Sequence, residues 1–296
     1  MTQYAENIYS MDGNCPMEDK FSSGYFDVVV EPGRSILRYW SDLWRFRELM
    51  YFLAWRDILV RYKQTVIGIA WSVLRPFVTM IVFTIVFGKL AKLPSHGLPY
   101  PVMVFAAMLP WQFFASSLTE CSNSLIENAN MLTKVYFPRM LIPASCIAVS
   151  IVDFAISLVM LSGMMVWYQV TPSWRIMTIP LFFMLALLTS LGFGLWMAAL
   201  NVKYRDFRYV VPFIVQFGLF ISPIGFSSSI VPEEWRLLYS LNPMVGVIDG
   251  FRWALLGSSA DISWTGLVLS IAVALLVGIL GTGYFRKTEH YFADII

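Results

Sequence analysis

The feature that most constrains this chain is a set of six long apolar runs, at about residues 66–88, 101–123, 140–168, 175–200, 209–229 and 263–285. A bilayer core of about 30 Å needs about 20 apolar residues of helix, and each run supplies that length. Only helices and closed barrels satisfy every backbone polar group in lipid, and runs this long are helices. With 58% hydrophobic and 14% charged residues and a mean hydropathy of +0.65, the chain also has too few polar residues to coat a water-soluble protein. The sequence therefore predicts an all-α polytopic membrane protein with six transmembrane helices.

The Lys and Arg residues lie mainly on one side of these runs. Most of them precede residue 66 or lie in the loops after the second and fourth runs and in the C-terminal tail. Since cytoplasmic loops carry an excess of Lys and Arg, we expect a multi-pass protein of the inner membrane with both termini in the cytoplasm. We expect three regions: an acidic, disordered tail at 1–35, an amphipathic helix at 36–65 and the six-span domain at 66–296. Whether the tail binds a partner stays open.

Residues 36–65 are too charged to span a membrane and too apolar to be a loop. At helical spacing, Trp, Tyr and Leu residues share one side and Arg and Lys residues share the other. This pattern is typical of a helix lying in the headgroup plane. Arg47 and Arg61 interrupt the apolar side, where long side chains can reach back to the surface. The alternative is a basic stretch that only enforces topology.

Two connecting segments have unusual composition. The loop 124–139 is short and mixed in polarity, so it is either a passive connector or a short helix presented to a soluble partner. The segment 230–262 holds apolar stretches too short to cross the membrane, separated by Asn242 and Pro243. Proline breaks a helix here. We therefore expect two short re-entrant helices on the external side, between the fifth and sixth spans, that form a lid over a pathway.

Arg75 and Asp153 are charged residues that lie well inside the predicted spans. A charge at this depth is costly and usually faces a partner or a wet cavity. The two residues are interpreted either as an ion pair that holds two helices together or as part of a polar pathway wall.

Aromatic residues are dense in the first and fifth spans. Most such residues are explained by interfacial belts and by packing in lipid. A minority could line a pathway, because the C–H faces of sugar rings stack on aromatic rings. The candidates are Trp71, Phe77, Phe213, Phe217 and Phe220.

The residues needed for several kinds of chemistry are absent from the sequence. There is no GxxxxGK[ST] phosphate loop, so the chain has no evident means of hydrolysing ATP. The two histidines, His96 and His290, lie in a loop and in the tail, so we predict neither a His-based metal site nor a catalytic site. We expect a non-catalytic membrane subunit that holds no cofactor of its own and binds no nucleic acid.

An ordered set of motifs resembles one family. The set comprises RYKQTVIGIAWSVLRP at 61–76, LPWQFF at 109–114, NANMLTKVYFPRMLIP at 128–143, LNVKYRDFRYVVP at 200–212, SPIGF at 222–226 and LNPM at 241–244. In this order they resemble the membrane subunit of type-2 ABC exporters, in the polysaccharide-export branch that handles O-antigen and teichoic-acid glycans.

The resemblance implies a homodimer with two copies of a separate ATP-binding subunit, which would hold the ATP and Mg²⁺. The substrate would be a glycan on a polyprenyl diphosphate lipid, moving between the two membrane subunits along the first and fifth spans. The amphipathic helix would be a gate helix. Contact with the ATPase is implied for Glu127, Asn128, Asn130, Leu132 and Lys134, and an external gate for Asn242, Pro243, Asp249 and Arg252.

Other functions share part of this pattern. A type-2 ABC permease for a drug or a lipid would have the same architecture. A self-contained channel or secondary transporter would need no ATPase subunit. A membrane-embedded glycan enzyme would need catalytic residues that we do not find.

Overall fold

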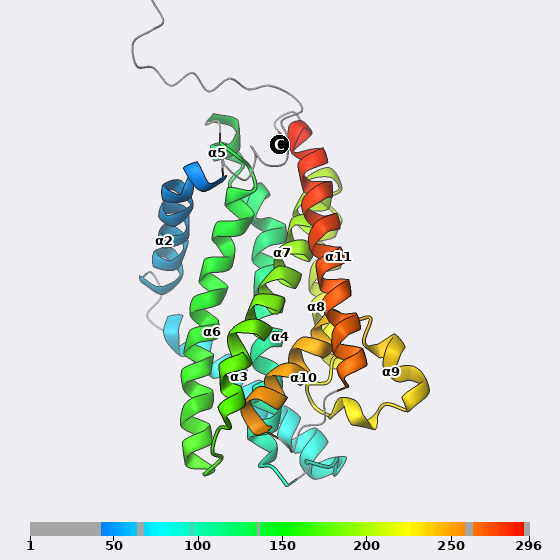
Figure 1. Ribbon diagram of the computed structural model, residues 1–296. Coiled ribbons are helices and arrows are strands. Elements are labelled where there is room, and N and C mark those ends of the chain that lie inside the picture. Colours follow the sequence, from blue (N-terminus) through cyan, green and yellow to red (C-terminus); the bar gives the residue numbers. More distant parts are fainter. Residues whose placement is uncertain (1–42, 64–67, 96, 135–136, 258–262, 293–296) are drawn as a thin grey trace, which may run out of the picture. The chain divides into compact units, whose positions relative to one another are not determined.

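The computed structural model describes residues 43–63, 68–95, 97–134, 137–257 and 263–292, and within these ranges it is helical and has no strand (Figure 1). The predicted acidic tail lies outside the described residues. The helices are α2 (Arg47–Lys63), α3 (Gly68–Phe83), a π-helical continuation η1 (Thr84–Leu90), α4 (Tyr100–Glu127), α5 (Ala129–Lys134), α6 (Leu141–Trp167), α7 (Ile179–Lys203), α8 (Phe207–Ile221), α9 (Glu233–Tyr239), α10 (Pro243–Leu256) and α11 (Trp264–Thr288).

Five helical stretches among the described residues are long and apolar enough to cross a membrane: Ala70–Leu90, Tyr100–Glu127, Leu141–Trp167, Trp174–Lys203 and Trp264–Tyr291. The prediction of a multi-pass helical protein is therefore confirmed. The fifth predicted run is different, because α8 has only 15 residues and ends before Ser222 and Pro223. At 1.5 Å per residue this helix is about 22 Å long, shorter than a bilayer core.

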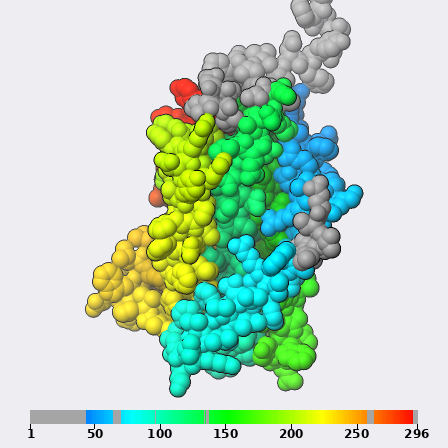
Figure 2. Space-filling view, turned by 180° about the vertical axis from the view of Figure 1, so that it is seen from behind, coloured from blue at the N-terminus to red at the C-terminus, as the bar shows by residue number. Residues whose placement is uncertain are grey.

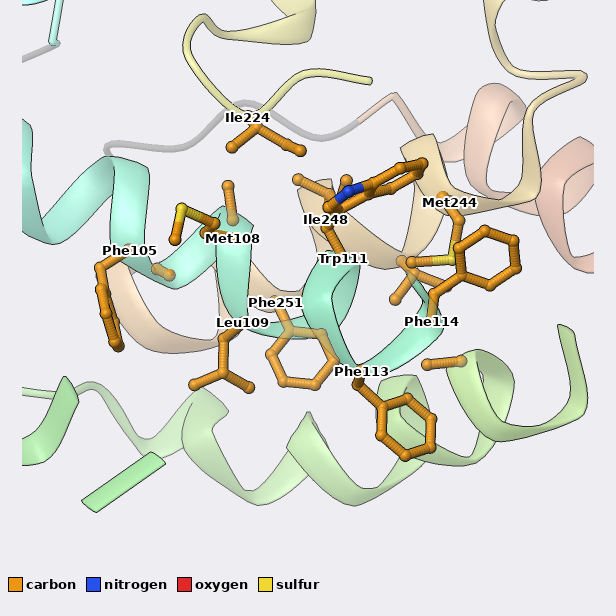
Figure 3. Close-up of a cluster of buried hydrophobic side chains, with 14 of the residues drawn as sticks. Phe105, Met108, Leu109, Trp111, Phe113, Phe114, Ile224, Met244, Ile248 and Phe251 are labelled. Carbon is orange, nitrogen blue, oxygen red and sulfur yellow. The ribbon is translucent and has the colours of Figure 1, made fainter. Parts of the chain in front are cut away.

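Helix α4 is the centre of the bundle. It contacts α6, α7 and α10, and most of its side chains are buried. Figure 3 shows the core on one stretch of α4, where Trp111 and Phe113 lie near Ile248 and Phe251 of α10. The ring of Phe113 also packs 5.8 Å from Phe154 of α6 and 5.0 Å from Phe183 of α7, measured between ring centroids. Apolar packing around α4 therefore fixes the positions of the helices that surround it.

Helices α7 and α11 approach closely at glycines. A carbon added at Gly281 would lie 2.0 Å from the carbonyl oxygen of Gly192, and a carbon added at Gly192 would lie 2.8 Å from the backbone of Gly278. Small residues at such positions let two backbones come together within a membrane.

The segment after α8 forms the two expected short helices, separated at Asn242 and Pro243. The Asn242 side chain caps α10 by accepting a hydrogen bond from the Met244 N–H at 3.0 Å, and Pro243 takes the first helical position. Helix α10 is almost wholly buried against α4, α7 and α11, whereas α9 has no buried residue. Figure 1 places α9 and α10 at the opposite end of the bundle from α5 and the end of α11.

Candidate membrane pathway and its two ends

The five predicted pathway aromatics all lie on exposed surfaces of α3 and α8. Their exposed fractions are 60% for Trp71, 40% for Phe77, 58% for Phe213, 52% for Phe217 and 60% for Phe220. Helix α8 buries only Val211 fully. An exposed apolar face this large is explained by lipid or by a protein partner.

Helices α3 and α8 both contact α4, and they also contact each other through aromatic rings. The Phe220 ring stacks on Phe83 of α3 at 6.4 Å, and Phe213 lies 4.2 Å from Phe217 along α8. Beyond them, Gly225 packs against the ring of Phe87. We call the five predicted residues, two on α3 and three on α8, the aromatic face (Trp71, Phe77, Phe213, Phe217 and Phe220). The contact between Phe83 and Phe220 joins these two helices.

Asp153 is the centre of a polar cluster that fastens α2 to the bundle. Its carboxylate pairs with the Arg61 guanidinium at 2.9 Å and accepts hydrogen bonds from the Tyr62 hydroxyl at 2.5 Å and the Ser72 hydroxyl at 2.7 Å. Arg61 also contacts the Glu120 carboxylate of α4 at 3.0 Å. Burial, together with the hydrogen bond to Asp153, raises the pKa of Tyr62 to about 12, so this hydroxyl stays a donor at neutral pH. The cluster ties four helices, α2, α3, α4 and α6, together.

The expected pairing of Arg75 with Asp153 is wrong. Arg75 is exposed on α3, and no carboxylate of the described residues lies within ion-pairing distance of it. Ser72, almost one turn earlier, is the α3 residue that faces Asp153. Arg61, which seemed only to interrupt an apolar side, points into the bundle, and Arg75 points away from it.

The predicted ATPase-contact residues differ in exposure. Glu127, Asn130 and Lys134 are exposed at the end of α4 and on α5, whereas Leu132 is only 6% exposed and packs within the chain. Asn128 accepts a hydrogen bond from Arg56 of α2 at 3.0 Å. Leu132 therefore contributes to the fold of this segment, and its burial leaves it little area for contact with another protein.

The predicted external-gate residues lie at the opposite end and hold the chain between α8 and α9. Arg252 is 4% exposed and donates to the carbonyls of Ile224 and Phe226 at 2.7 Å each and of Met103 at 3.3 Å. The Asn242 amide donates to the Ser222 hydroxyl at 3.1 Å. Asp249, half-buried on α10, interacts with Ser228 and Arg252. These contacts satisfy the backbone of a non-helical stretch that is itself buried.

Two charged residues, Glu120 and Arg61, were not assigned from the sequence to the cluster around Asp153. Glu120 lies inside the predicted run 101–123, and the rule that singled out Arg75 and Asp153 applies to it as well. The indication for Arg61 was weaker, because the sequence showed only a charged residue on the apolar side of an amphipathic helix. Its two carboxylate partners lie far away in sequence, so helical periodicity could not pair them.

Comparison with known proteins gives a consistent assignment. The model of the ABC-2 type transporter family matches residues 48–256, from α2 to the end of α10. The chain is 26% identical over 220 residues to the O-antigen export system permease protein RfbA of Myxococcus xanthus, covering 73% of this chain and 84% of that protein.

Two further relatives cover similar lengths. The RfbA protein of Klebsiella pneumoniae is 26% identical over 251 residues, which are 84% of this chain and 95% of the relative. The polysialic acid transport protein KpsM of Escherichia coli is 21% identical over 232 residues, which are 76% of this chain and 88% of the relative. This chain belongs to the ABC-2 type transporter family, as a membrane permease of its polysaccharide-export branch.

Proposed function

We propose that this chain is the permease subunit of an ATP-driven exporter that moves a lipid-linked polysaccharide, an O-antigen-like glycan, from the cytoplasm across the inner membrane. Two copies of the chain would form the channel between them, and two copies of a separate subunit would bind ATP and Mg²⁺. The observation that carries this proposal is the aromatic face, on a chain whose relatives are named as glycan-export permeases.

The aromatic face suits a glycan for a chemical reason. A glycan has many hydroxyls and few charges, so a wall that lets it slide needs weak, repeated contacts. Aromatic rings offer flat apolar surfaces to the C–H faces of sugars. With a second copy opposite, the aromatic faces of α3 and α8 would enclose a path and be withdrawn from lipid.

The sixth membrane crossing is completed, in this proposal, by α8 together with the stretch from Ser222 to Phe226. Non-helical backbone is tolerated at membrane depth where protein surrounds it. Tyr100 donates to the Gly225 carbonyl and Arg252 to those of Ile224 and Phe226, so the stretch is satisfied from within. Helix α10 would then dip into the outer leaflet as a re-entrant helix and close the external end.

The ATPase would dock at the other end, which we place in the cytoplasm together with both termini. Exposed Glu127, Asn130 and Lys134 lie there, and α2 lies beside the same end, where its Arg56 reaches Asn128. Movement of an ATPase against α5 would thus reach α2, the proposed gate helix, whose exposed Tyr51, Phe52 and Trp55 suit the membrane interface.

Alanine substitutions test the proposal in cells that depend on this permease for surface glycan. We expect Trp71→Ala and Phe217→Ala to lower export while the complex still assembles and hydrolyses ATP. Matched controls are Trp167→Ala on α6 and Ile279→Ala on α11, which are also highly exposed. Normal export by both test variants would remove the aromatic face from the pathway. Transport of a drug or a lipid, with no effect on glycan, would favour the alternative permease class.

A further inference from the structure

Helix α4 has a row of polar residues along the one side that its neighbours leave partly exposed. Gln112, Ser116, Thr119, Glu120 and Asn123 recur at spacings of three and four, so they share one face from the middle of α4 toward its end at Glu127. We call these five residues the α4 polar face. The remaining sides of α4 are buried against α6, α7 and α10.

The exposed sides of the other long spans are different in composition. Residues with large exposed fractions are Ile151 and Val159 on α6, Leu181 and Met184 on α7, and Leu276 and Ile279 on α11. These side chains suit lipid. Polar side chains within a span face a protein interior or a wet cavity, because hydrocarbon offers no hydrogen bonds. On the α4 polar face, the side chains of Gln112, Glu120 and Asn123 are therefore unsuited to contact with lipid. The hydroxyls of Ser116 and Thr119 instead bond within their own helix.

The contacts at its edges show what flanks this face. On one edge, Arg61 of α2 reaches Glu120 at 3.0 Å. On the other edge, the Asn201 amide of α7 donates to the Asn123 side chain at 3.3 Å, and Gly218 of α8 packs against the ring of Trp111. Figure 2 shows the same arrangement, with green α4 between yellow-green α8 and blue α2. The polar face thus forms a floor, and Phe213 and Phe217 lie on the helix beside it.

The floor offers both donors and acceptors of hydrogen bonds. The Ser116 and Thr119 hydroxyls donate to carbonyls of their own helix, those of Gln112 at 2.9 Å and Ala115 at 2.8 Å, so their oxygens remain available as acceptors. The Gln112 side-chain amide makes no hydrogen bond to any residue that the structure describes, which leaves two donors and one acceptor open. The Glu120 carboxylate pairs with Arg61, whose single positive charge is shared with Asp153.

We propose that the α4 polar face is the hydrogen-bonding floor of the export pathway and takes the hydroxyl groups of the passing glycan, while the aromatic face contacts its sugar rings. Residues four apart on a helix are about 6 Å apart along its axis, so the groups are repeated along the path. This inference rests on the proposed function and names the part of the chain that would distinguish a hydroxyl-rich substrate from an apolar one.

The test is a triple variant, Gln112→Met, Ser116→Ala and Thr119→Val, which removes the polar groups with little change of volume. A neutral hydrogen bond contributes modestly, so losing several should lower glycan export at least about fivefold. The complex should still assemble and hydrolyse ATP. The matched control is Ser162→Ala with Thr282→Val, because these hydroxyls also bond to carbonyls of their own spans, α6 and α11, away from α4. We expect the control to export normally.

Each outcome decides the inference. Export by the triple variant at the level of the control would overturn it, and so would loss of subunit assembly, since the polar face would then be a contact between copies. If the triple variant does not reach the membrane, Gln112→Met is tested alone, and we expect it to lower glycan export. This substitution should leave the fold intact, because the Gln112 side chain has no described hydrogen bond to lose.

The variant Phe217→Ala separates this inference from the proposed function. If Phe217→Ala lowers glycan export and the triple variant exports normally, the proposed function stands and the inference fails. If Trp71→Ala and Phe217→Ala both export normally, the proposed function itself is removed.

Discussion

At the scale of single residues, Asp153 shows how a charge is held inside this protein. Three groups from two other helices surround its carboxylate: Arg61 and Tyr62 from α2 and Ser72 from α3. A charge at this depth requires such compensation, since an unpaired ion in a medium of low polarity is strongly disfavoured. The second carboxylate on Arg61, that of Glu120, brings α4 into the same network. The docking of α2 therefore includes polar contacts to α4 and α6, beside the buried apolar side chain of Leu53.

This network predicts coupled effects of substitution. Arg61→Gln leaves two carboxylates without their cation and should destabilise the subunit by about 1–3 kcal/mol, because partial exposure weakens the interaction. Asp153→Asn should be milder, since Arg61 keeps Glu120. The double variant should be less destabilised than the sum of the two, as measured by thermal unfolding in detergent.

Arg75→Gln is the matched control for that cycle. Because Arg75 and Asp153 do not pair, the effects of Arg75→Gln and Asp153→Asn should add. Non-additive effects in this second cycle, or additive effects in the first, would contradict the arrangement around Asp153.

At the scale of helices, the contact between α7 and α11 depends on the absence of side chains. Gly281→Ala places a carbon 2.0 Å from the Gly192 carbonyl oxygen, so the two helices must move apart. We expect a loss of about 1–3 kcal/mol, seen as a lower unfolding temperature in detergent. Gly283→Ala is the control on the same helix, because the added carbon would have no other described part of the chain within 4 Å beyond its own helix backbone. Equal unfolding temperatures for the two variants would contradict the close packing.

Helix α5 and the last residue of α4, Glu127, lead to a second prediction at this scale. Glu127→Lys with Lys134→Glu reverses two exposed charges and should leave the fold intact while it reduces the coupling of ATP hydrolysis to export. Leu132→Arg should instead lower the amount of folded subunit, because that side chain is 6% exposed. Measuring the recovered subunit and the ratio of ATP hydrolysed to glycan exported separates the two effects. Good recovery of Leu132→Arg would show that Leu132 is free to contact a partner.

The same elements show how far the sequence alone could go. The long apolar runs predicted the helices α3, α4, α6, α7 and α11, and Asn242 with Pro243 marked the break between α9 and α10. The partner of Asp153 and the burial of Leu132 could not be predicted, because helical spacing shows which residues share a face and leaves open which helix that face meets. The early end of α8 at Ile221 is signalled by Ser222 and Pro223, but the predicted run 209–229 continued past them. The pathway roles proposed from the resemblance stay predictions.

At the scale of the whole molecule, the distribution of exposed residues sets one side of the bundle apart. Helices α6, α7 and α11 expose mainly aliphatic residues, with Trp167 and Trp264 at helix ends, whereas α3 and α8 expose aromatic rings as well as aliphatic residues beside the polar side of α4. The two ends also differ, with exposed Glu127 of α4 and Lys134 of α5 at one end and a buried Arg252 cluster at the other. This asymmetry is the physical basis for the proposed pathway between two copies, with the proposed ATPase contact at the α5 end and the proposed gate at the α10 end.

Photo-crosslinking during export tests this central claim most directly. A photoreactive residue is placed at position 217 on α8, and the control is placed at position 279 on α11, two sites with similar exposure of 52% and 68%. The account predicts that position 217 forms adducts with the glycan and with a second copy of the chain, in amounts that rise when ATP is present. Position 279 should form adducts with lipid. Lipid adducts alone at position 217, or glycan adducts of equal yield at position 279, would contradict the account.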